Sequence, residues 1–331
     1  MSVYHAEHDV TLHLGHVLDV LPTLAAESVN CVVTSPPYYG LRDYGIEGQI
    51  GLEASPSEYV ETMRAVFAEV RRVLRPDGVL WLNLGDSYSS GSGGDSNLTA
   101  LGERLGTGGG QKADSSKVRR PPTSGLPAKN LLGVPWRVAF ALQDDGWTLR
   151  AEVIWSKRNS MPESVTDRPS RSHEQVFLFS KSPRYWYNAE AIREDSDPEQ
   201  VAHNERYAKP YAAFDERAAA SGKPGARNSV GIHSRPGKPG HNARTVWTIS
   251  TQPYAAAHFA TFPPELARRC IAAGCPPDGT VLDPFTGSGT TLMVARRLLR
   301  KSVGIELNPR YCELIVDRIG QPIFDFGEAS A

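Results

Sequence analysis

The stretch TVLDPFTGSGTTLMVARRLLRKSVGIELNPRYCELIVDRI, residues 280–319, decides the fold. A short apolar strand (280–283) leads through a glycine turn into a helix (290–299), a second strand (302–307) and a second helix (309–319). Strands that alternate with helices in this way are typical of a parallel sheet with helices on both faces. We therefore expect an α/β fold with a doubly wound, mostly parallel, Rossmann-like sheet.

Further strands and helices are expected on the N-terminal side of this stretch. Tyr59, Met63, Val66 and Val70 recur at helical spacing within residues 56–75. A helix with this pattern ends where proline and glycine follow, here at positions 76–78. The other expected elements are strands at 29–33, 79–85, 148–155 and 175–180 and helices at 136–142 and 263–274.

Composition divides the chain into five segments. The expected sheet falls in residues 1–86, 130–185 and 251–331. Between the first two of these, residues 87–129 are rich in Gly, Ser and Pro and predict a flexible basic loop. Residues 186–250 again have few apolar runs and predict a smaller, loop-rich second module.

The bulk composition limits the class of protein. The 331 residues are 40% apolar and carry a formal net charge of -1, which allows a large core and by itself neither favours nor excludes a nucleic-acid partner. The four cysteines form no CxxC pair, so neither a zinc site nor a disulfide framework is expected. The N-terminus has no signal pattern and no apolar run is long enough to span a membrane, which predicts a soluble cytoplasmic protein.

The glycine turn at 284–290 indicates a bound small molecule. Glycines after a strand let the backbone approach a ligand, and the helix that follows favours a carboxylate or phosphate at its N-terminus. A phosphate-binding P-loop needs lysine where Thr290 stands, and a dinucleotide fingerprint needs glycine where Leu292 stands. S-adenosylmethionine fits better, because Glu306 can accept bonds from ribose hydroxyls and Asp283 can pair with an ammonium group.

The second chemical motif, Thr34-Ser35-Pro36-Pro37-Tyr38, follows another expected parallel strand. Its two prolines make a stiff loop with outward carbonyls, which suits a site that accepts hydrogen bonds. An exocyclic amino group is a poor nucleophile until such acceptors orient it, and Tyr38 offers a face for a flipped base. The predicted catalytic residues are Ser35, Pro36, Pro37 and Tyr38, acting by positioning.

Together, TSPPY and DPFTGSGTT resemble the motifs of the β-class amino-methyltransferases of DNA. In that family the target motif precedes the cofactor motif, a circular permutation of the usual order. Residues 258–263, 80–86, 153–157 and 308–311 resemble further family segments. The predicted cofactor-binding residues are Thr34, His258, Phe262, Asp283, Pro284, Phe285, Gly287, Ser288, Gly289, Thr290 and Glu306.

The chain departs from the family pattern at one position. Family members often have Gly-Asp in the opening strand, where the acid contacts the cofactor adenine, but this chain has Gly15-His16. We do not count His16 as catalytic. Within the family, S-P-P-Y resembles the cytosine-N4 enzymes and D-P-P-Y the adenine-N6 enzymes, so the resemblance favours N4 of cytosine.

Double-stranded DNA is the predicted partner. Basic residues gather in the segments 87–129 and 186–250, and flexible basic segments wrap a phosphate backbone. The second of these segments lies where the family places target recognition. The predicted DNA-binding residues are Arg119, Arg120, Lys223, Arg227, Arg235, Lys238 and Arg244. A cognate restriction endonuclease and a second copy of the chain are further candidate partners.

Other functions stay open at this point. The chain could methylate N6 of adenine, an RNA base or a side-chain amide, since a PPY loop can hold other planar amino groups. It could also be a non-catalytic DNA-binding protein on the same scaffold. The intact TSPPY and glycine-turn motifs favour an enzyme, and the basic insert favours a polyanionic substrate over a small amide.

Overall fold

The computed structural model describes residues 2–7, 9–41, 43, 45–89, 126–160, 162–195, 240–252 and 262–320. The chain divides into two compact units, one of Met1–Asn188 with Thr245–Ala331 and one of Ala189–Arg244. In the smaller unit, the described residues form the 3-10 helix η3 (Ala189–Ile192) and a bridge between Glu194 and His241. The sheet lies in the larger unit.

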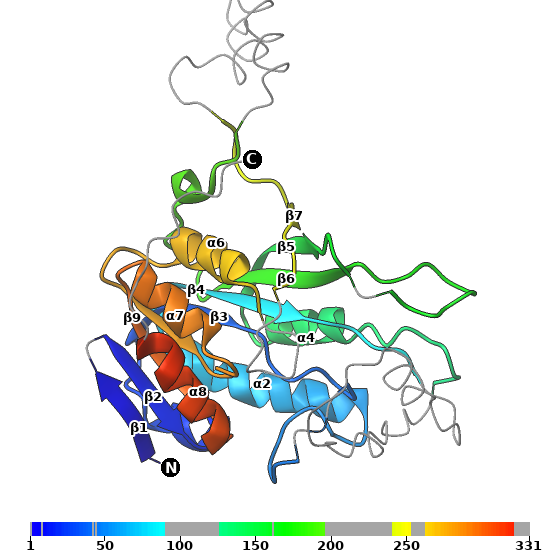
Figure 1. Ribbon diagram of the computed structural model, residues 1–331, viewed down its shortest axis with the longest axis horizontal. Coiled ribbons are helices and arrows are strands. Elements are labelled where there is room, and N and C mark those ends of the chain that lie inside the picture. Colours follow the sequence, from blue (N-terminus) through cyan, green and yellow to red (C-terminus); the bar gives the residue numbers. More distant parts are fainter. Residues whose placement is uncertain are drawn as a thin grey trace, which may run out of the picture. The chain divides into compact units, whose positions relative to one another are not determined.

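The described strands form one sheet in the order β1-β2-β9-β8-β3-β4-β6-β5-β7 (Figure 1). Their bounds are β1 (Ser2–Glu7), β2 (Val10–Leu14), β3 (Val29–Thr34), β4 (Leu74–Leu84), β5 (Thr148–Ser156), β6 (His173–Ser180), β7 (Val246–Thr248), β8 (Thr280–Asp283) and β9 (Lys301–Glu306). Among these described strands, only the β1/β2, β4/β6 and β5/β6 pairs are antiparallel. The predicted doubly wound, mostly parallel sheet is confirmed.

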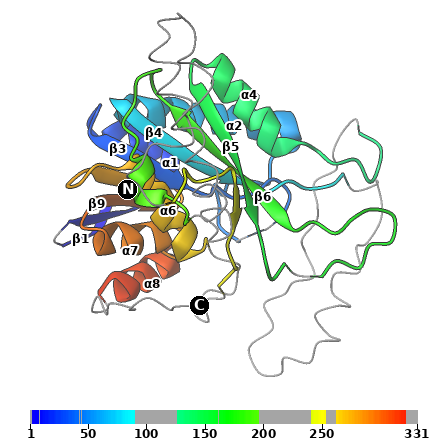
Figure 2. The same ribbon diagram turned by 90° about the horizontal axis from the view of Figure 1, so that it is seen from above.

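Helices cover both faces of the sheet, as Figure 2 shows. One face carries α2 (Pro56–Val73) and α4 (Val134–Asp144), and the other carries α6 (Pro264–Gly274), α7 (Thr290–Arg297) and α8 (Pro309–Gly320). The short helices α1 (Val17–Val20) and η1 (Leu21–Thr23) follow β2. Coverage on both faces explains why β3 is a nearly continuous apolar run, with five of its six residues buried.

Helix α2 shows how the sequence sets this packing. Ser55 caps its first turn by accepting a hydrogen bond from the Glu58 N–H at 3.2 Å, and Pro56 stands at the first helical position, where no N–H is needed. Its apolar stripe is fully buried against the sheet, with Phe67 and Phe177 of β6 in the same core. Burying each such side chain stabilises the fold by about 1.5–3 kcal/mol.

The strand order reverses between β3 and β8. From β3 the chain passes through α2 to β4 on one side, and from β8 it passes through α7 to β9 on the other. Parallel strands that wind in opposite directions leave a crevice beyond their carboxyl ends, which is where ligands bind in open α/β sheets. TSPPY follows β3 and the glycine turn follows β8, so both predicted motifs meet at this crevice.

Some elements differ from the sequence expectation. The strands β1, β2 and β7 are not among the expected elements. The expected helix 56–75 ends at Val73, and β4 begins at Leu74 instead of Val79. Pro76 and Gly78 interrupt the ladder, since Val29 pairs with Leu74 but Cys31 already pairs with Val79. The proline and glycine therefore make a bulge within the strand instead of a separate turn.

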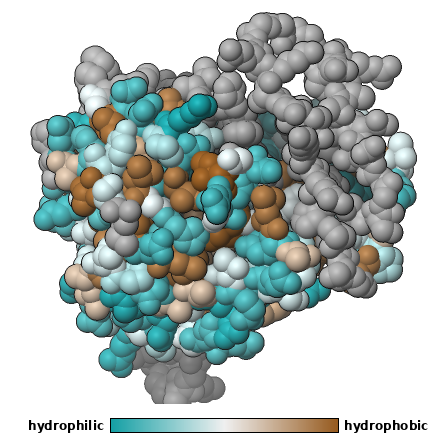
Figure 3. Space-filling model, turned by 90° about the horizontal axis from the view of Figure 1, so that it is seen from below, coloured by the Kyte–Doolittle hydropathy of each residue, from teal (hydrophilic) through white to brown (hydrophobic). Residues whose placement is uncertain are grey.

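Figure 3 shows one face, where apolar side chains gather near the middle with polar side chains around them. In the part of the chain that the structure describes, no helix has both the length and the apolar character needed to cross a membrane. All four cysteines are free and buried.

Candidate functional site

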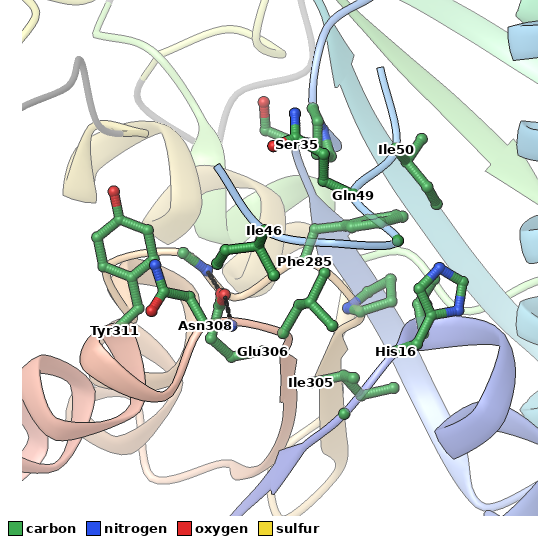
Figure 4. A pocket seen from close by; sticks show the side chains of 17 residues that line it. His16, Ser35, Ile46, Gln49, Ile50, Phe285, Ile305, Glu306, Asn308 and Tyr311 are labelled. Carbon is green, nitrogen blue, oxygen red and sulfur yellow. Dashed lines mark hydrogen bonds between the residues drawn. The ribbon is translucent and has the colours of Figure 1, made fainter. Parts of the chain in front are cut away.

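A cavity of about 730 Å³, partly open to solvent, lies at the crevice between β3 and β8 (Figure 4). Its walls come from the ends of β2, β3, β8 and β9 and from the loop that follows TSPPY. The lining residues are Gly15, His16, Val17, Ser35, Pro37, Ile46, Gly48, Gln49, Ile50, Pro284, Phe285, Gly287, Ile305, Glu306, Leu307, Asn308 and Tyr311. The lining is largely apolar with a few polar groups, as in small-molecule sites.

Buried hydrogen bonds join the two motifs beneath this cavity. The Thr34 hydroxyl donates to Asp283 Oδ1 at 2.7 Å, and the Thr291 hydroxyl donates to the Val33 carbonyl at 3.3 Å. These bonds connect residues about 250 positions apart. Burial raises the pKa of Asp283 to about 6, although the bonds from the Thr34 hydroxyl and the Phe285 N–H oppose the shift.

Glu306 holds the glycine turn through its carboxylate. Oε2 accepts from the Gly287 N–H at 2.8 Å and Oε1 accepts from the Asn308 N–H at 2.8 Å. Gly287 has φ +54°, a left-handed conformation that favours glycine. Burial raises the pKa of Glu306 to about 7 despite these bonds. The two backbone N–H groups therefore do not fully offset the cost of burying the ionised carboxylate.

Two residues of the glycine turn bond to α8. The Arg318 guanidinium donates to the Ser288 carbonyl at 2.9 Å and to the hydroxyls of Ser288 and Thr290 at 3.0 Å each. Gly289 has φ +79°, and an added Cβ there would lie 3.1 Å from Ile315. The turn is therefore packed tightly against α8.

The TSPPY loop is fixed from behind. The Tyr59 hydroxyl, on α2, donates to the Pro37 carbonyl at 2.8 Å. The Tyr38 ring lies so close to Gly85 that a Cβ added to this glycine would come within 2.5 Å of Tyr38 Cε2. The Tyr38 hydroxyl donates to Glu174 Oε2 at 2.7 Å and accepts from Asn83 Nδ2 at 2.7 Å. Both the backbone and the ring of this loop thus have set positions.

The structure brings many of the predicted site residues together. Ser35, Pro37, Pro284, Phe285, Gly287 and Glu306 line the cavity, while Thr34, Pro36, Asp283, Gly289 and Thr290 are buried beside it. Tyr38, Ser288 and Phe262 are not among the lining residues. His258, Arg119, Arg120, Lys223, Arg227, Arg235 and Lys238 lie outside the described residues. Arg244 is described and exposed, in the smaller unit.

Several residues of the cavity wall are absent from the predicted set. His16 lines the cavity and caps α1, with Nδ1 accepting from the Leu18 N–H at 3.3 Å. Other parts of the wall come from Ile46, Gln49 and Ile50 and from Asn308 and Tyr311, as Figure 4 shows. The sequence carries a signal for one of these, since Asn308 before Pro309 is a typical helix start directly after Glu306.

Comparisons with known proteins agree on one family. A model of the N6/N4 methyltransferases, described as DNA methylase, matches residues 29–317. Type II methyltransferase M.XycI of Xanthomonas campestris pv. cyanopsidis is 46% identical over 309 residues, which cover 93% of this chain and 87% of that protein. Type II methyltransferase M.SmaI of Serratia marcescens is 45% identical over 312 residues, which cover 92% of this chain and 89% of that protein.

Solved structures show the same fold. The PvuII DNA methyltransferase, named cytosine-N4-specific, matches with a TM-score of 0.62 at 20% identity and covers 96% of this chain and 89% of its own. A protein of Thermus thermophilus, provisionally named a DNA modification methylase and complexed with S-adenosyl-L-methionine, matches with a TM-score of 0.52 at 21% identity, covering 94% and 96% of the two chains.

Proposed function

This chain belongs to the N6/N4-type DNA methylase family, and we propose that it methylates N4 of a cytosine flipped out of duplex DNA. One observation carries the proposal. Ser35, from the target motif, and Glu306, beside the glycine turn, line the same cavity. A methyl donor held by one motif therefore faces an amino group held by the other, and an activated methyl group needs no covalent enzyme intermediate.

The cavity fits S-adenosylmethionine, the cofactor of this family, which supplies an electrophilic methyl group when bound. Phe285, Ile305 and Ile50 supply apolar surface for a purine ring, and Glu306 supplies acceptors for ribose hydroxyls. The raised pKa values of Glu306 and Asp283 indicate buried carboxyl groups that a cationic, hydroxyl-rich ligand would favour in their ionised form.

The target loop provides acceptors for an amino group. Tyr59 already occupies the Pro37 carbonyl, so we assign the Pro36 carbonyl and Ser35 Oγ as the two acceptors. Two such bonds orient the amino hydrogens and leave the nitrogen lone pair toward the methyl donor. Accepting bonds in a preorganised, partly buried site costs no reorganisation when charge develops on the nitrogen.

The Tyr38 ring is the proposed stacking surface for the flipped base. Base–aromatic stacking contributes about 1–3 kcal/mol. A ring that is anchored at its hydroxyl and pressed against Gly85 presents a fixed face, so the base loses less freedom on a rigid platform than on a mobile one.

Cytosine N4 is favoured over adenine N6 by Ser35 at the head of the motif and by the fold match to an enzyme named cytosine-N4-specific. Adenine N6 is the second candidate within the same family. We assign target recognition to residues 186–250 and DNA contacts to the basic residues predicted above. Pairing with a restriction endonuclease and assembly of two copies are further proposals, supported only by the relatives named Type II methyltransferases.

The test is transfer of a tritiated methyl group to DNA, RNA and protein acceptors, followed by mass spectrometry of the nucleosides. We expect label in DNA alone and N4-methylcytosine as the product. N6-methyladenine would replace the cytosine assignment, and label in RNA or protein alone would overturn the DNA assignment. DNA binding without transfer, in protein shown to bind S-adenosylmethionine, would favour the non-catalytic alternative.

A further inference from the structure

An ion pair behind the target loop has no part in the function described so far. Lys157 Nζ contacts Glu174 Oε1, and the two side chains are only 21% and 14% exposed. Lys157 Nζ also lies 4.7 Å from the centre of the Trp155 ring. Removing two charges from water carries a large desolvation cost, so a buried ion pair is by itself weak evidence for a role in stability.

The topology explains why this carboxylate reaches the target loop. Strand β6 runs antiparallel to β4 and β5, so its first residues lie beside the last residues of those two strands. Glu174 is opposite Trp155 of β5, and the next residue, Gln175, is opposite Leu84 of β4. An acid at the start of β6 therefore stands at the same edge as TSPPY, which follows β3.

A chain of hydroxyl groups connects Glu174 to the cavity. Glu174 Oε2 accepts from the Tyr38 hydroxyl at 2.7 Å and from Asn83 Nδ2 at 2.9 Å. The Tyr38 oxygen in turn accepts from the Ser35 hydroxyl at 3.1 Å. Ser35 also accepts from Asn83 Nδ2 at 3.3 Å, and it lines the cavity.

The direction of the donors along this chain follows from the carboxylate. An ionised carboxylate only accepts, so the single proton of the Tyr38 hydroxyl is committed to Glu174. The Tyr38 oxygen can then only accept from Ser35, and this bond commits the Ser35 proton. A hydroxyl has two lone pairs, and the Asn83 amide, which shares its two hydrogens among Tyr38, Glu174 and Ser35, occupies at most one of those on Ser35. The remaining lone pair makes Ser35 an acceptor toward the cavity.

The ionised state of Glu174 is maintained by its neighbours. Burial is the largest single influence and acts to raise the pKa of Glu174, but the Lys157 ammonium and the hydrogen bonds from Lys157, Tyr38 and Asn83 together outweigh it and hold this pKa below its ordinary value. Lys157 at the end of β5 and Tyr38 after β3 are the titratable groups that contact it, and Asn83 of β4 is the uncharged one. The direction of the chain therefore holds at neutral pH.

We propose that Glu174 is a positioning residue which, through Tyr38, fixes Ser35 Oγ as a hydrogen-bond acceptor for the target amino group. This rests on the proposed function of Ser35. The amino group is a donor, and a serine free to rotate would offer it a proton for part of the time. Lys157 keeps Glu174 charged, and Asn83 holds both hydroxyls in place.

A merely structural ion pair predicts different behaviour. If Lys157 and Glu174 only joined β5 to β6, removing the carboxylate would lower the melting temperature and leave the chemical step unchanged in the folded protein. Replacing both partners would then restore the loss, because neutral pairs of similar volume are often as stable as a buried ion pair. In the proposed role, the rate of methyl transfer depends on the Glu174 carboxylate and not on the ion pair, so replacing both partners would not restore it.

The decisive variants are Glu174→Gln and the double variant Glu174→Gln with Lys157→Met. Gln keeps the shape of Glu174 but has an amide that can donate to Tyr38. We expect both variants to lower the single-turnover rate of methyl transfer about 10- to 100-fold, the worth of one hydrogen bond to a charged group. Binding of S-adenosylmethionine, measured by calorimetry, should stay within about twofold, because the cavity residues that contact it are unchanged.

Tyr38→Phe supplies the second arm, since it keeps the ring for stacking and breaks the hydroxyl chain. We expect a loss of rate similar to that of Glu174→Gln, and almost no further loss when the two changes are combined, because one interruption already frees Ser35. Additive losses, or a wild-type rate in Glu174→Gln, would overturn the inference. A rate restored to wild type by the double variant with Lys157→Met would overturn it as well.

The hydroxyl chain can also be read without turnover. In protein labelled with ¹³Cζ-tyrosine, the Tyr38 signal, identified by its loss in Tyr38→Phe, should shift in Glu174→Gln while the other signals stay. An unmoved Tyr38 signal would overturn the inference even if the protein methylated no DNA. If the wild-type protein methylated no DNA, the proposed function would be overturned. The Tyr38 signal would still report whether Glu174 sets the hydrogen bond of the Tyr38 hydroxyl.

Discussion

The two sides of the cavity are held by different kinds of hydrogen bonds. On the cofactor side, Glu306 accepts from backbone N–H groups of Gly287 and Asn308, 19 and 2 residues away. On the target side, Tyr38 is held by the side chains of Asn83 and Glu174, 45 and 136 residues away. The cofactor side is fixed by nearby backbone groups and the target side by distant side chains, so a substitution on one side should impair only the function of that side. Changes on one side should therefore leave the other side working.

The largest effect is expected from Glu306→Ala, on the cofactor side. The change removes the ribose acceptor and leaves the N–H groups of Gly287 and Asn308 without their partner, which loosens the turn. Two lost bonds to a charged group correspond to an S-adenosylmethionine Kd about 100-fold higher. Calorimetry with the purified protein measures this change directly.

Glu306→Gln is the matched control for that prediction. Gln keeps the volume and one acceptor oxygen, so its Kd should lie between those of the wild type and Glu306→Ala. DNA binding, followed by fluorescence anisotropy, should stay near wild type in both variants, because Glu306 lies on the cofactor side. A Kd unchanged by Glu306→Ala would contradict the ribose assignment.

A smaller step, on the target side, is expected between Tyr38→Phe and Tyr38→Ala. Both variants lack the hydroxyl, so loss of the stacking face should lower the single-turnover methyl-transfer rate about 30-fold below that of Tyr38→Phe, in line with the worth of base–aromatic stacking. Binding of S-adenosylmethionine should stay within about twofold. If the cofactor affinity fell as far as the rate, the two sides would not be separable and the comparison would be wrong.

The same contrast explains what the sequence could predict. The glycine turn, Asp283 and Glu306 lie within 24 residues of continuous strand, turn and strand, so spacing alone indicated a ligand site. TSPPY was predicted as a motif from its prolines and its place after an apolar run. The meeting of the two motifs followed from the rule that parallel strands share one carboxyl edge, and the bonds of β3 to Asp283 of β8 and to Thr291 of α7 agree with it.

The support behind Tyr38 could not be predicted from local patterns. An apolar run such as residues 175–180 indicates a strand but not its direction, and only the antiparallel setting of β6 brings Glu174 to the active edge. Lys157 and Asn83 depend on the same pairing. His16 was named from the sequence only as the residue in place of the family's acid, because its position in the cavity wall depends on the pairing of β2 with β9.

Gly85→Ala tests the target side with the smallest possible change. The added Cβ would lie 2.5 Å from Tyr38 Cε2, so the ring must move while its hydroxyl is held by Asn83 and Glu174. We expect the methyl-transfer rate to fall about tenfold with unchanged cofactor binding, the cost of a displaced positioning group. Gly320→Ala is the matched control, because an added Cβ there meets nothing within 4 Å. An equal loss in both variants would show a general effect on the fold.

The smallest expected effect is a dependence of cofactor binding on pH. Folding raises the pKa of Asp283 from 3.8 to about 6 and that of Glu306 from 4.5 to about 7. Between these values the folded protein holds more protons than the unfolded chain. The contribution of these two groups to the free energy of unfolding therefore falls as pH rises from about 4 to about 7. The bound cofactor should act in the opposite direction, because its ammonium and hydroxyl groups favour the ionised carboxylates.

We therefore expect the S-adenosylmethionine affinity to fall about fivefold from pH 7.5 to 6.0, as the carboxyl groups take up protons that the cofactor must displace. The increase in melting temperature on adding cofactor should be larger at pH 7.5 than at pH 6.0 for the same reason. Glu306→Gln cannot gain this proton, so its Kd should change less over the same range. A wild-type Kd that is constant from pH 6.0 to 7.5 would show that neither buried carboxyl group changes its charge when the cofactor binds. The two sides of the cavity would then no longer differ in the way proposed. On the cofactor side the buried carboxyl groups become charged when the ligand binds, whereas on the target side the described buried charges are already paired.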